Sequence, residues 1–384
     1  MIYILTDRHR TGGTETWLSN LCYNLDKLEK TYIIIRDELV NTNINSEDTI
    51  ILNNYHCNIN DNIVNQIYNL NTQVYFVVHS DICPSNYYLI KYINIINNVI
   101  FVSEPIKTKL KEKLLQIKPT LNLFVLTNVV QTNVFLSDLS FSARSNKKAT
   151  IFNFVGRISQ EKNIPMLLYA LAQIDKPNWI LNIYGDTYNT RYYEIIKNII
   201  KSLDLSNNVN LCGFVQDKLH IYTNCDYVVL PSVSEGSSYT ILESLAFGTP
   251  VIACLNVGDN NDKITNGVSG YLIDLCGIDN INNINNINND KIYANDYHEI
   301  LKSVGYLEAV LMQDYDGDGY ISMNSNRIIV PPNLYNRRND IFDSNVTKVK
   351  DVLINSITNK LTIKPIIFSD ENKQLCCIKN MLCS

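Results

Sequence analysis

The sequence predicts an α/β protein built from two doubly wound domains. Short apolar runs of strand length alternate with helix-length segments from residue 1 to about residue 275, a pattern typical of parallel α/β sheets. The alternation stops between Phe141 and Thr150, where the residues are small and polar, and then starts again. A chain of 384 residues can form two domains that each bury a core.

The expected strands fall into two sets. In the first half of the chain they are Ile2–Thr6, Tyr32–Ile35, Thr49–Leu52, Val74–His79, Val99–Ser103 and Leu123–Leu126. In the second half they are Ile151–Val155, Trp179–Tyr184, Val209–Cys212, Tyr227–Pro231 and Val251–Ala253. We therefore expect a first domain at residues 1–140, a linker at 141–150 and a second domain at 151–275.

The last part of the chain, residues 276–384, has a weaker pattern. Asn280–Asn289 repeats an Asn-Ile-Asn triplet and is expected to be an exposed, low-complexity insertion. A helix is expected at His298–Met312, and the remainder is expected to be an irregular extension, either without further helices or with one helix that returns to the first domain.

Composition argues against several classes of protein. The 38 acidic and 33 basic residues give a net charge of −5, which disfavours a nucleic-acid binder that neutralises phosphates. The ten cysteines are scattered without Cys-x-x-Cys or Cys/His metal spacing, so reduced thiols in a cytoplasmic protein are expected. The opening residues MIYILTDRHR are too short an apolar run for a signal peptide, and no run approaches the ~18 apolar residues that span a bilayer.

The segment Asp226–Ala253 carries the most specific signal. It predicts a buried strand, a turn, a helix at about Ser238–Phe247, a Gly-Thr-Pro stop and a second strand. In open α/β sheets, ligands bind at the carboxyl edge where such loops lie. The free N–H groups at the start of the helix can hold a diphosphate, and the residues concerned are Gly236, Ser237, Ser238 and Tyr239.

Two carboxylates of this segment suit a nucleotide sugar. Glu235 lies in the loop and Glu243 about two turns into the helix. Both can accept hydrogen bonds from hydroxyl groups on either side of the phosphates. We expect both acids to line the site, and an acid buried in a domain interior would count against this interpretation.

A basic loop follows the first strand of the second domain. Gly156 is followed by Arg157, and Lys162 lies five residues further on. A guanidinium fork and an ammonium point charge at a sheet's carboxyl edge suit a diphosphate leaving group. The alternative is a solvated basic loop, but the Glu235–Glu243 pair in the same domain favours a functional site.

The first domain offers weaker signals. Gly12 and Gly13 separate the first strand from an amphipathic helix at Glu15–Leu25, so they permit either close approach to a ligand or only a tight turn. His79 ends an expected strand, where a histidine can be catalytic or structural.

Residues 104–118 form an expected helix with five lysines and an apolar stripe of Ile106, Leu110, Leu114 and Ile117. Such a helix can rest on anionic lipid headgroups, giving peripheral membrane contact, or can simply cover a domain.

Residues 314–325 have the aspartate spacing of a calcium loop. The twelfth position is Ser325 rather than Glu, and Pro331-Pro332 interrupt any following helix, so we expect no calcium site.

Taken together, these residues resemble the retaining GT-B glycosyltransferases of family 4. The resemblance covers about residues 1–275 and is strongest in the Glu-x7-Glu element with the following GTPVIA, and in FVGRISQEKN. The segments GGTE, VSE (102–104), TNVV and YGD also fit. The resemblance implies two Rossmann-like domains facing across a cleft, with a nucleoside-diphosphate sugar held mainly by the second.

The resemblance also implies roles for individual residues. Arg157 and Lys162 would neutralise the donor diphosphate, Glu243 would bind the ribose hydroxyls and Glu235 the transferred sugar. Gly13 would let the first domain approach the donor phosphates, and His79 would contact the donor sugar. The acceptor would be a carbohydrate or a lipid-linked hydroxyl, and no metal or cofactor would be required because the two cations carry the charge.

The chain departs from the family pattern in several places. Ser237-Ser238 replace a usual Phe-Gly, Val129 replaces a glycine, and residues 259–262 replace a second glycine and a Pro-Glu pair. Members of this family usually finish with a helix that returns to the first domain, and the tail shows no pattern that places it. Two alternative functions remain: a sugar-nucleotide epimerase or phosphorylase on the same fold, and an inactive nucleotide-sugar-binding scaffold.

Overall fold

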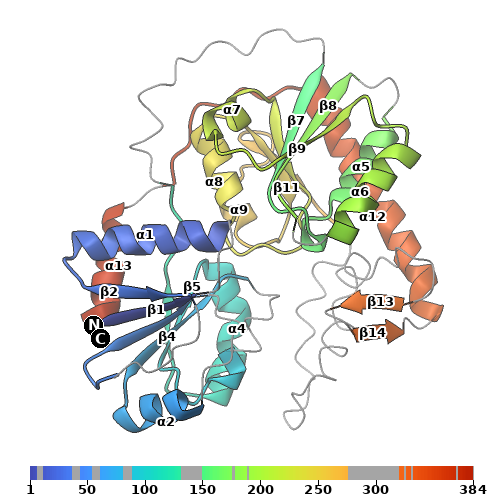
Figure 1. The fold of residues 1–384 in the computed structure, drawn as a ribbon. Helices are drawn as coiled ribbons and strands as arrows, with labels where there is room; N and C mark the ends of the chain where they lie inside the picture. The colour runs from blue at the N-terminus through green and yellow to red at the C-terminus, as the bar shows by residue number, and fades with distance from the viewer. Residues whose placement is uncertain are drawn as a thin grey trace. The chain divides into compact units, whose positions relative to one another are not determined.

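A computed structural model of the chain describes its fold. The described residues are 1–6, 12–36, 44–53, 61–80, 89–130, 149–174, 178–187, 190–275, 320–323, 326–329, 332–368 and 371–383. They form two compact units (Figure 1). Unit 1 comprises Met1–Gln131, Ser234–Tyr239 and Phe368–Ser384, and unit 2 comprises Thr132–Val233 and Thr240–Ile367.

Unit 1 is built on a parallel sheet with the strand order β2-β1-β3-β4-β5-β6. The strands are β1 (Ile2–Thr6), β2 (Tyr32–Ile35), β3 (Thr49–Asn53), β4 (Gln73–Val78), β5 (Asn98–Phe101) and β6 (Asn122–Val125). The central strands are almost wholly buried, which explains their near-continuous Ile, Val and Phe content, since a parallel sheet is covered on both faces. The order reverses between β1 and β3, so the ligand-binding edge predicted for such a sheet lies there.

The helices of unit 1 connect these strands. They are α1 (Gly13–Lys27), α2 (Asp61–Leu70) and α4 (Glu104–Ile117). Pro105 lies in the first turn of α4, where its missing N–H costs no hydrogen bond. Ile106 and Leu114 of α4 are buried, so these two residues of its apolar stripe pack within unit 1.

Unit 2 contains a second parallel sheet with the order β12-β11-β10-β7-β8-β9. The strands are β7 (Thr150–Val155), β8 (Trp179–Tyr184), β9 (Val209–Gly213), β10 (Tyr227–Leu230), β11 (Val251–Cys254) and β12 (Gly270–Ile273). This is the order of a Rossmann sheet, with its reversal between β7 and β10. The helices are α5 (Ile164–Ala172), α6 (Thr190–Ser202), α7 (Lys218–Thr223), α8 (Tyr239–Ala246) and α9 (Asn260–Lys263), with a short 3-10 turn at Gln160–Lys162.

The C-terminal region is more regular than the sequence suggested. An antiparallel hairpin of β13 (Tyr320–Met323) and β14 (Asn326–Ile329) precedes α12 (Pro332–Thr358), which packs on α5 and β12 in unit 2. Helix α13 (Glu371–Cys383) lies beside α1 in unit 1 (Figure 1). Residues 332–358 and 371–383 are therefore helical rather than irregular, and α13 is a helix of unit 1 that the sequence pattern did not place.

Polar contacts hold α13 in unit 1. Gln374 donates a hydrogen bond to the Thr127 carbonyl, and the Tyr75 hydroxyl donates to the Met381 carbonyl. Ile378 and Met381 are buried beside them. The interior face of this helix thus includes a glutamine, which weakened its apolar periodicity in the sequence.

The α/β prediction of two doubly wound sheets is confirmed. Several expectations fall outside the described residues: the linker at 141–148, the Asn280–Asn289 repeat, the helix at 298–312 and the acidic positions 314–318 of the calcium-like loop. Where that loop continues into the described part, at residues 320–323, it forms β13.

The loop after β7 packs closely on the end of β8. Gly156 and Ile158 donate backbone hydrogen bonds to the carbonyls of Tyr184 and Asp186, at 3.0 and 2.9 Å. A Cβ on Gly185 would lie 1.9 Å from the Gly156 carbonyl oxygen, and Gly185 has φ +147°. Gly185 is therefore required both for its backbone angle and for this close approach.

We expect Gly185→Ala to destabilise unit 2, because the added methyl must push the Gly156 loop away. The melting temperature should fall by roughly 5–10 °C, several times the usual effect of one surface change. Gly213→Ala is the matched control, since Gly213 also has a positive φ but no atom lies within 4 Å of its added Cβ. Calorimetry that finds equal shifts for both variants would show that the close approach does not matter.

Candidate functional site

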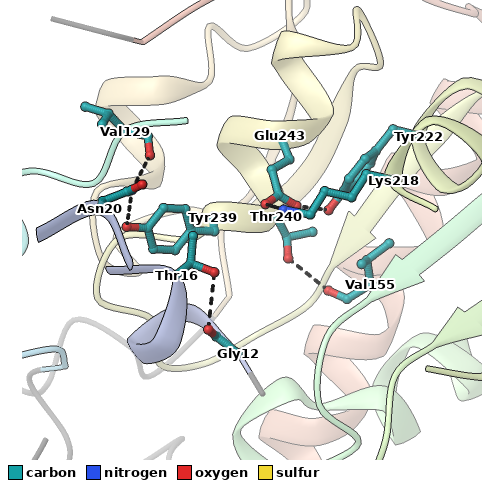
Figure 2. Close-up of polar contacts among 10 residues, drawn as sticks. All are labelled: Gly12, Thr16, Asn20, Val129, Val155, Lys218, Tyr222, Tyr239, Thr240 and Glu243. Carbon is teal, nitrogen blue, oxygen red and sulfur yellow. Dashed lines mark hydrogen bonds and ion pairs between the residues drawn. The ribbon is translucent and has the colours of Figure 1, made fainter. Parts of the chain in front are cut away.

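The candidate site of unit 2 lies at the carboxyl ends of β7 and β10. These two strands pair in parallel although β8 and β9 separate them in the chain. The Thr240 hydroxyl, in the first turn of α8, donates a 3.1 Å hydrogen bond to the Val155 carbonyl at the end of β7 (Figure 2). This bond fixes the start of α8 beside the loop that carries the two predicted cations.

The cations Arg157 and Lys162 flank a carboxylate that the sequence interpretation overlooked. Arg157 Nη2 lies 3.4 Å from Glu161 Oε1, and the Ser159 hydroxyl donates to the same oxygen at 2.6 Å. Burial acts to raise the pKa of Glu161, but Lys162, Arg157 and Ser159 together hold that pKa below its ordinary value. The loop therefore offers two cations with one ionised carboxylate between them.

Lys162 folds back toward the end of β7. A Cβ on Gly156 would lie 3.9 Å from Lys162 Cε, so the lysine stem passes over this glycine. The Arg157 side chain is 45% exposed and reaches solvent from the same loop. Both cations thus belong to the sheet edge predicted for them.

Glu243 is more enclosed than the sequence suggested. Its residue is only 7% exposed, and both carboxylate oxygens have partners from α7 (Figure 2). Lys218 Nζ donates to Oε1 at 2.6 Å, and the Tyr222 hydroxyl donates to Oε2 at 2.7 Å. Glu243 is therefore buried beneath α7, which differs from the expectation that both acids line the site, and only its partner Lys218 is partly exposed, at 39% of its side chain.

Tyr222 is a neutral donor in this arrangement. Burial, with the nearby charge of Glu243, raises the pKa of Tyr222 well above its ordinary value. The phenol therefore keeps its proton and donates it to the carboxylate.

In unit 1, the loop Ser234–Tyr239 is held mainly through its backbone. Ser103 donates to the Gly236 carbonyl at 3.1 Å, and Asn128 donates to the Ser237 carbonyl at 2.6 Å. A Cβ on Gly236 would lie 1.8 Å from the His79 carbonyl oxygen, so only glycine fits there. Glu235 is half-buried in this loop, and Ser237 and Ser238 are buried.

His79 lies at the end of β4 with its ring oriented by neighbours. Nε2 is 2.7 Å from Asn53 Oδ1, and Asn53 in turn donates to the Thr6 hydroxyl at 3.3 Å. The ring meets Trp17 edge-on, with centroids 5.3 Å apart. If Nε2 carries the proton toward Asn53, Nδ1 becomes the acceptor nitrogen.

The Gly12-Gly13 turn of unit 1 opens α1. A Cβ on Gly13 would lie 3.4 Å from Tyr239 Cδ2. The Tyr239 hydroxyl accepts a 3.2 Å hydrogen bond from Asn20, which also donates to the Val129 carbonyl (Figure 2). Tyr239 is therefore packed into unit 1. This packing anchors the loop Ser234–Tyr239, and it is also compatible with the predicted contact between Tyr239 and the nucleotide-sugar donor.

Several of these residues left no signal in the sequence. Lys218 and Tyr222 precede Glu243 by 25 and 21 positions and belong to another helix. Asn53, the partner of His79, is 26 positions away at the end of β3. Glu161 lies between Arg157 and Lys162 in the sequence. This position between two cations is the one sequence feature that could have indicated its ion pairs.

The described residues show no group of three or more His, Cys, Asp or Glu side chains suited to a metal ion. Across the same described part of the chain, none of the helices has both the length and the apolar character needed to cross a membrane.

Comparisons with known proteins agree with this architecture. The family model described as Glycosyl transferases group 1 matches residues 137–301, which include Arg157, Lys162, Glu235 and Glu243. The UDP-Gal:alpha-D-GlcNAc-diphosphoundecaprenol alpha-1,3-galactosyltransferase of Escherichia coli is 30% identical over 137 residues, covering 35% of this chain and 35% of that protein. The alpha-monoglucosyldiacylglycerol synthase of Streptococcus pneumoniae is 29% identical over 179 residues, covering 43% and 40%. The chain thus matches less than half of the length of these relatives.

A solved structure matches over the whole chain. Anabaena HepE, in complex with UDP and glucose, superposes with a TM-score of 0.58 at 16% identity, covering 100% of this chain and 99% of that one. Likeness at this identity concerns the fold alone, and it confirms the predicted GT-B class. The chain therefore has a GT-B fold, and its residues 137–301 are similar to the glycosyl transferases of group 1.

Proposed function

We propose that this protein is a glycosyltransferase that moves a sugar from a nucleoside-diphosphate donor to an acceptor hydroxyl. The observation that carries the proposal is that the loop of Arg157 and Lys162 meets the start of α8, the helix that carries Glu243, at the reversal point of the second sheet. Cations suit a diphosphate and a carboxylate suits the hydroxyl groups of a sugar or ribose. The similarity of residues 137–301 to glycosyl transferases group 1 supports the same conclusion.

The reaction places negative charge on a leaving diphosphate. The bond between the anomeric carbon and the phosphate oxygen breaks, and a bond forms from that carbon to the acceptor oxygen. Arg157 and Lys162 would stabilise the charge where it develops, a preorganised electrostatic effect. Because these two side chains supply the positive charge, the proposed reaction requires no metal or cofactor.

We further propose that the anomeric configuration is retained, as in family 4. The departing phosphate would take the acceptor proton on the same face of the sugar, so no enzyme nucleophile is needed. Glu235 would hold hydroxyls of the transferred sugar, with His79 contacting that sugar and Gly13 admitting the donor phosphates. These roles rest on the resemblance of the motifs that carry the residues.

A UDP-sugar is the first donor to test. The galactosyltransferase relative is named for UDP-Gal, and HepE was solved with UDP and glucose. The two relatives are also named for lipid-bearing compounds, a diphosphoundecaprenol and a diacylglycerol. We propose a carbohydrate or lipid-linked acceptor for this chain.

Two other functions make different predictions for the same site. An epimerase or phosphorylase would convert the donor without an acceptor hydroxyl, whereas a binding scaffold would bind the donor and leave it intact. Incubation of the protein with donor and inorganic phosphate, but without an acceptor hydroxyl, reveals an epimerase or a phosphorylase from the changed sugar. Addition of an acceptor then separates a transferase, which consumes the donor, from a scaffold, which leaves it intact. The paired cations and the Glu-x7-Glu element favour transfer.

A nucleotide panel tests the proposal directly. UDP, GDP, ADP and their glucose conjugates should be screened by thermal shift, and we expect one base to stabilise the protein. At a hundredfold excess over Kd a ligand adds about 2.7 kcal/mol to the free energy of unfolding. If none of the nucleotides changes the melting temperature, the proposed function is wrong.

Replacing Lys162 tests the catalytic assignment. Lys162→Ala should lower turnover by on the order of 10², because one preorganised cation is lost at the leaving group. Lys197→Ala is the control, since Lys197 pairs with Glu194 on the exposed side of α6. Full activity of the Lys162 variant in a coupled assay of released nucleoside diphosphate would contradict its role.

We also propose that α4 can give peripheral contact with anionic membranes through its exposed lysines. Lys107 is paired with Glu104, and Lys118 donates to the carbonyls of Ile93, Asn94 and Ile96, so the contact would rest on the exposed Lys111 and Lys113. Ile106 and Leu114 pack inward, which makes any attraction chiefly electrostatic, about 1 kcal/mol per lysine.

Sedimentation with vesicles containing phosphatidylserine measures this contact. We expect binding at low salt that weakens at physiological salt and falls after Lys111→Glu with Lys113→Glu. If the double variant and the unchanged protein bind the vesicles equally, the lysines of α4 do not contact the membrane and the helix only covers the sheet.

A further inference from the structure

The partners of Glu243 differ in how firmly they are held. Tyr222 is buried, its ring stacks on Phe247 with centroids 5.5 Å apart at an 18° angle, and its carbonyl accepts a hydrogen bond from Thr249. The carbonyl of the preceding residue, Ile221, accepts a 2.6 Å bond from the buried amide of Asn153. The phenol therefore cannot leave Glu243 without disturbing the packing between α7, α8 and β7.

Lys218 has no such enclosure. It is the first residue of α7, one turn before Tyr222 on the same face, and its side chain is 39% exposed. An ammonium on a flexible stem can exchange a carboxylate for water at small cost, because partly exposed ion pairs contribute little. One oxygen of Glu243 thus has a fixed neutral donor and the other an exchangeable charged donor.

This asymmetry has a meaning if Glu243 binds ribose hydroxyls. A ribose hydroxyl donates a hydrogen bond to a carboxylate, the same interaction that Lys218 makes with Oε1 at 2.6 Å. In the absence of a ligand, the buried Glu243 carboxylate is shielded from water and needs a compensating positive charge. Lys218 supplies that charge.

We infer that Lys218 holds the place of the nucleotide ribose on Glu243, and that a ribonucleotide displaces it while Tyr222 stays and orients the acid. Tyr222 is thus a positioning residue for the acid, and Lys218 competes with the nucleotide for it. The inference deepens the proposed function and rests on it. Its consequence is that the protein binds nucleotide less tightly than its site allows, because each binding event breaks an internal ion pair.

The test compares Lys218→Met with Lys197→Met by isothermal titration calorimetry. The probes are UDP and inorganic pyrophosphate, at about pH 8, where carboxyl groups are ionised. We expect Lys218→Met to bind UDP about two- to fivefold more tightly, the size of a partly exposed ion pair. Pyrophosphate has no ribose, so its affinity should not change, and Lys197→Met should leave both affinities unchanged.

Each other outcome overturns the inference. Unchanged UDP affinity would mean that Lys218 does not compete with the nucleotide. Weaker binding of both UDP and pyrophosphate would identify Lys218 as a phosphate contact. If neither the unchanged protein nor Lys218→Met binds UDP, GDP or ADP, both the proposed function and the inference are wrong. If both proteins bind a nucleotide but the variant does not bind it more tightly, only the inference is wrong. Lys218→Gln serves if the methionine variant does not fold.

A second pair of variants tests the role of Tyr222. Tyr222→Phe keeps the ring on Phe247 but removes the donor to Oε2, so UDP affinity should fall by about tenfold. The matched control is Tyr227→Phe, a buried tyrosine of the same unit whose hydroxyl accepts a hydrogen bond from the Leu361 amide. Equal UDP affinity in Tyr222→Phe and the unchanged protein would show that the phenol does not orient Glu243.

Discussion

The neighbouring positions of β7 and β10 are the constraint on which the site of unit 2 depends. The chain runs outward from β7 through β8 and β9, then returns to the opposite side of β7 with β10. At such a reversal the flanking connections leave in opposite directions, and a space opens at the carboxyl edge. The loop of Arg157 and the start of α8 come to this edge from different passes of the chain, and the Thr240 hydroxyl joins them by its bond to Val155.

Glu161 and Glu243 both have cationic partners before any ligand arrives. Glu161 lies beside Arg157 and Lys162, and Glu243 lies beside Lys218. Enclosed carboxylates need such partners, because an unpaired charge away from water is strongly unfavourable. A diphosphate entering this edge would therefore exchange partners with existing ion pairs, so its net gain is smaller than the raw attraction of two cations suggests. Arg157 can make this exchange most easily because nearly half of its side chain is exposed.

The sequence predicted the elements of both sheets but few of the contacts between distant segments. Continuous apolar runs such as Val74–Val78 identify buried strands directly, and the Gly-Thr-Pro stop identified the end of α8. Helix α13 was not predicted because its buried face includes the polar residue Gln374. Helix α12 was not predicted because polar Asn345 and Ser356 are buried on it together with Val346 and Val349. Local patterns indicate where Glu243 lies on a helix, but the lysine and tyrosine that meet it come from α7, and only the folded chain brings them together.

The Ser237-Ser238 pair, which differs from the Phe-Gly of the family-4 pattern that the sequence resembles, can be understood from how its loop is held. Ser103 and Asn128 bind the carbonyls of Gly236 and Ser237, groups that every residue type supplies. These anchors therefore survive when Phe-Gly is replaced by Ser-Ser. Gly236 is different, because any side chain there would collide with the His79 carbonyl. Gly236, the glycine that the backbone requires, is therefore present in this chain. The substitution begins at Ser237, whose hydrogen bond to Asn128 uses the backbone carbonyl and so does not depend on the side chain.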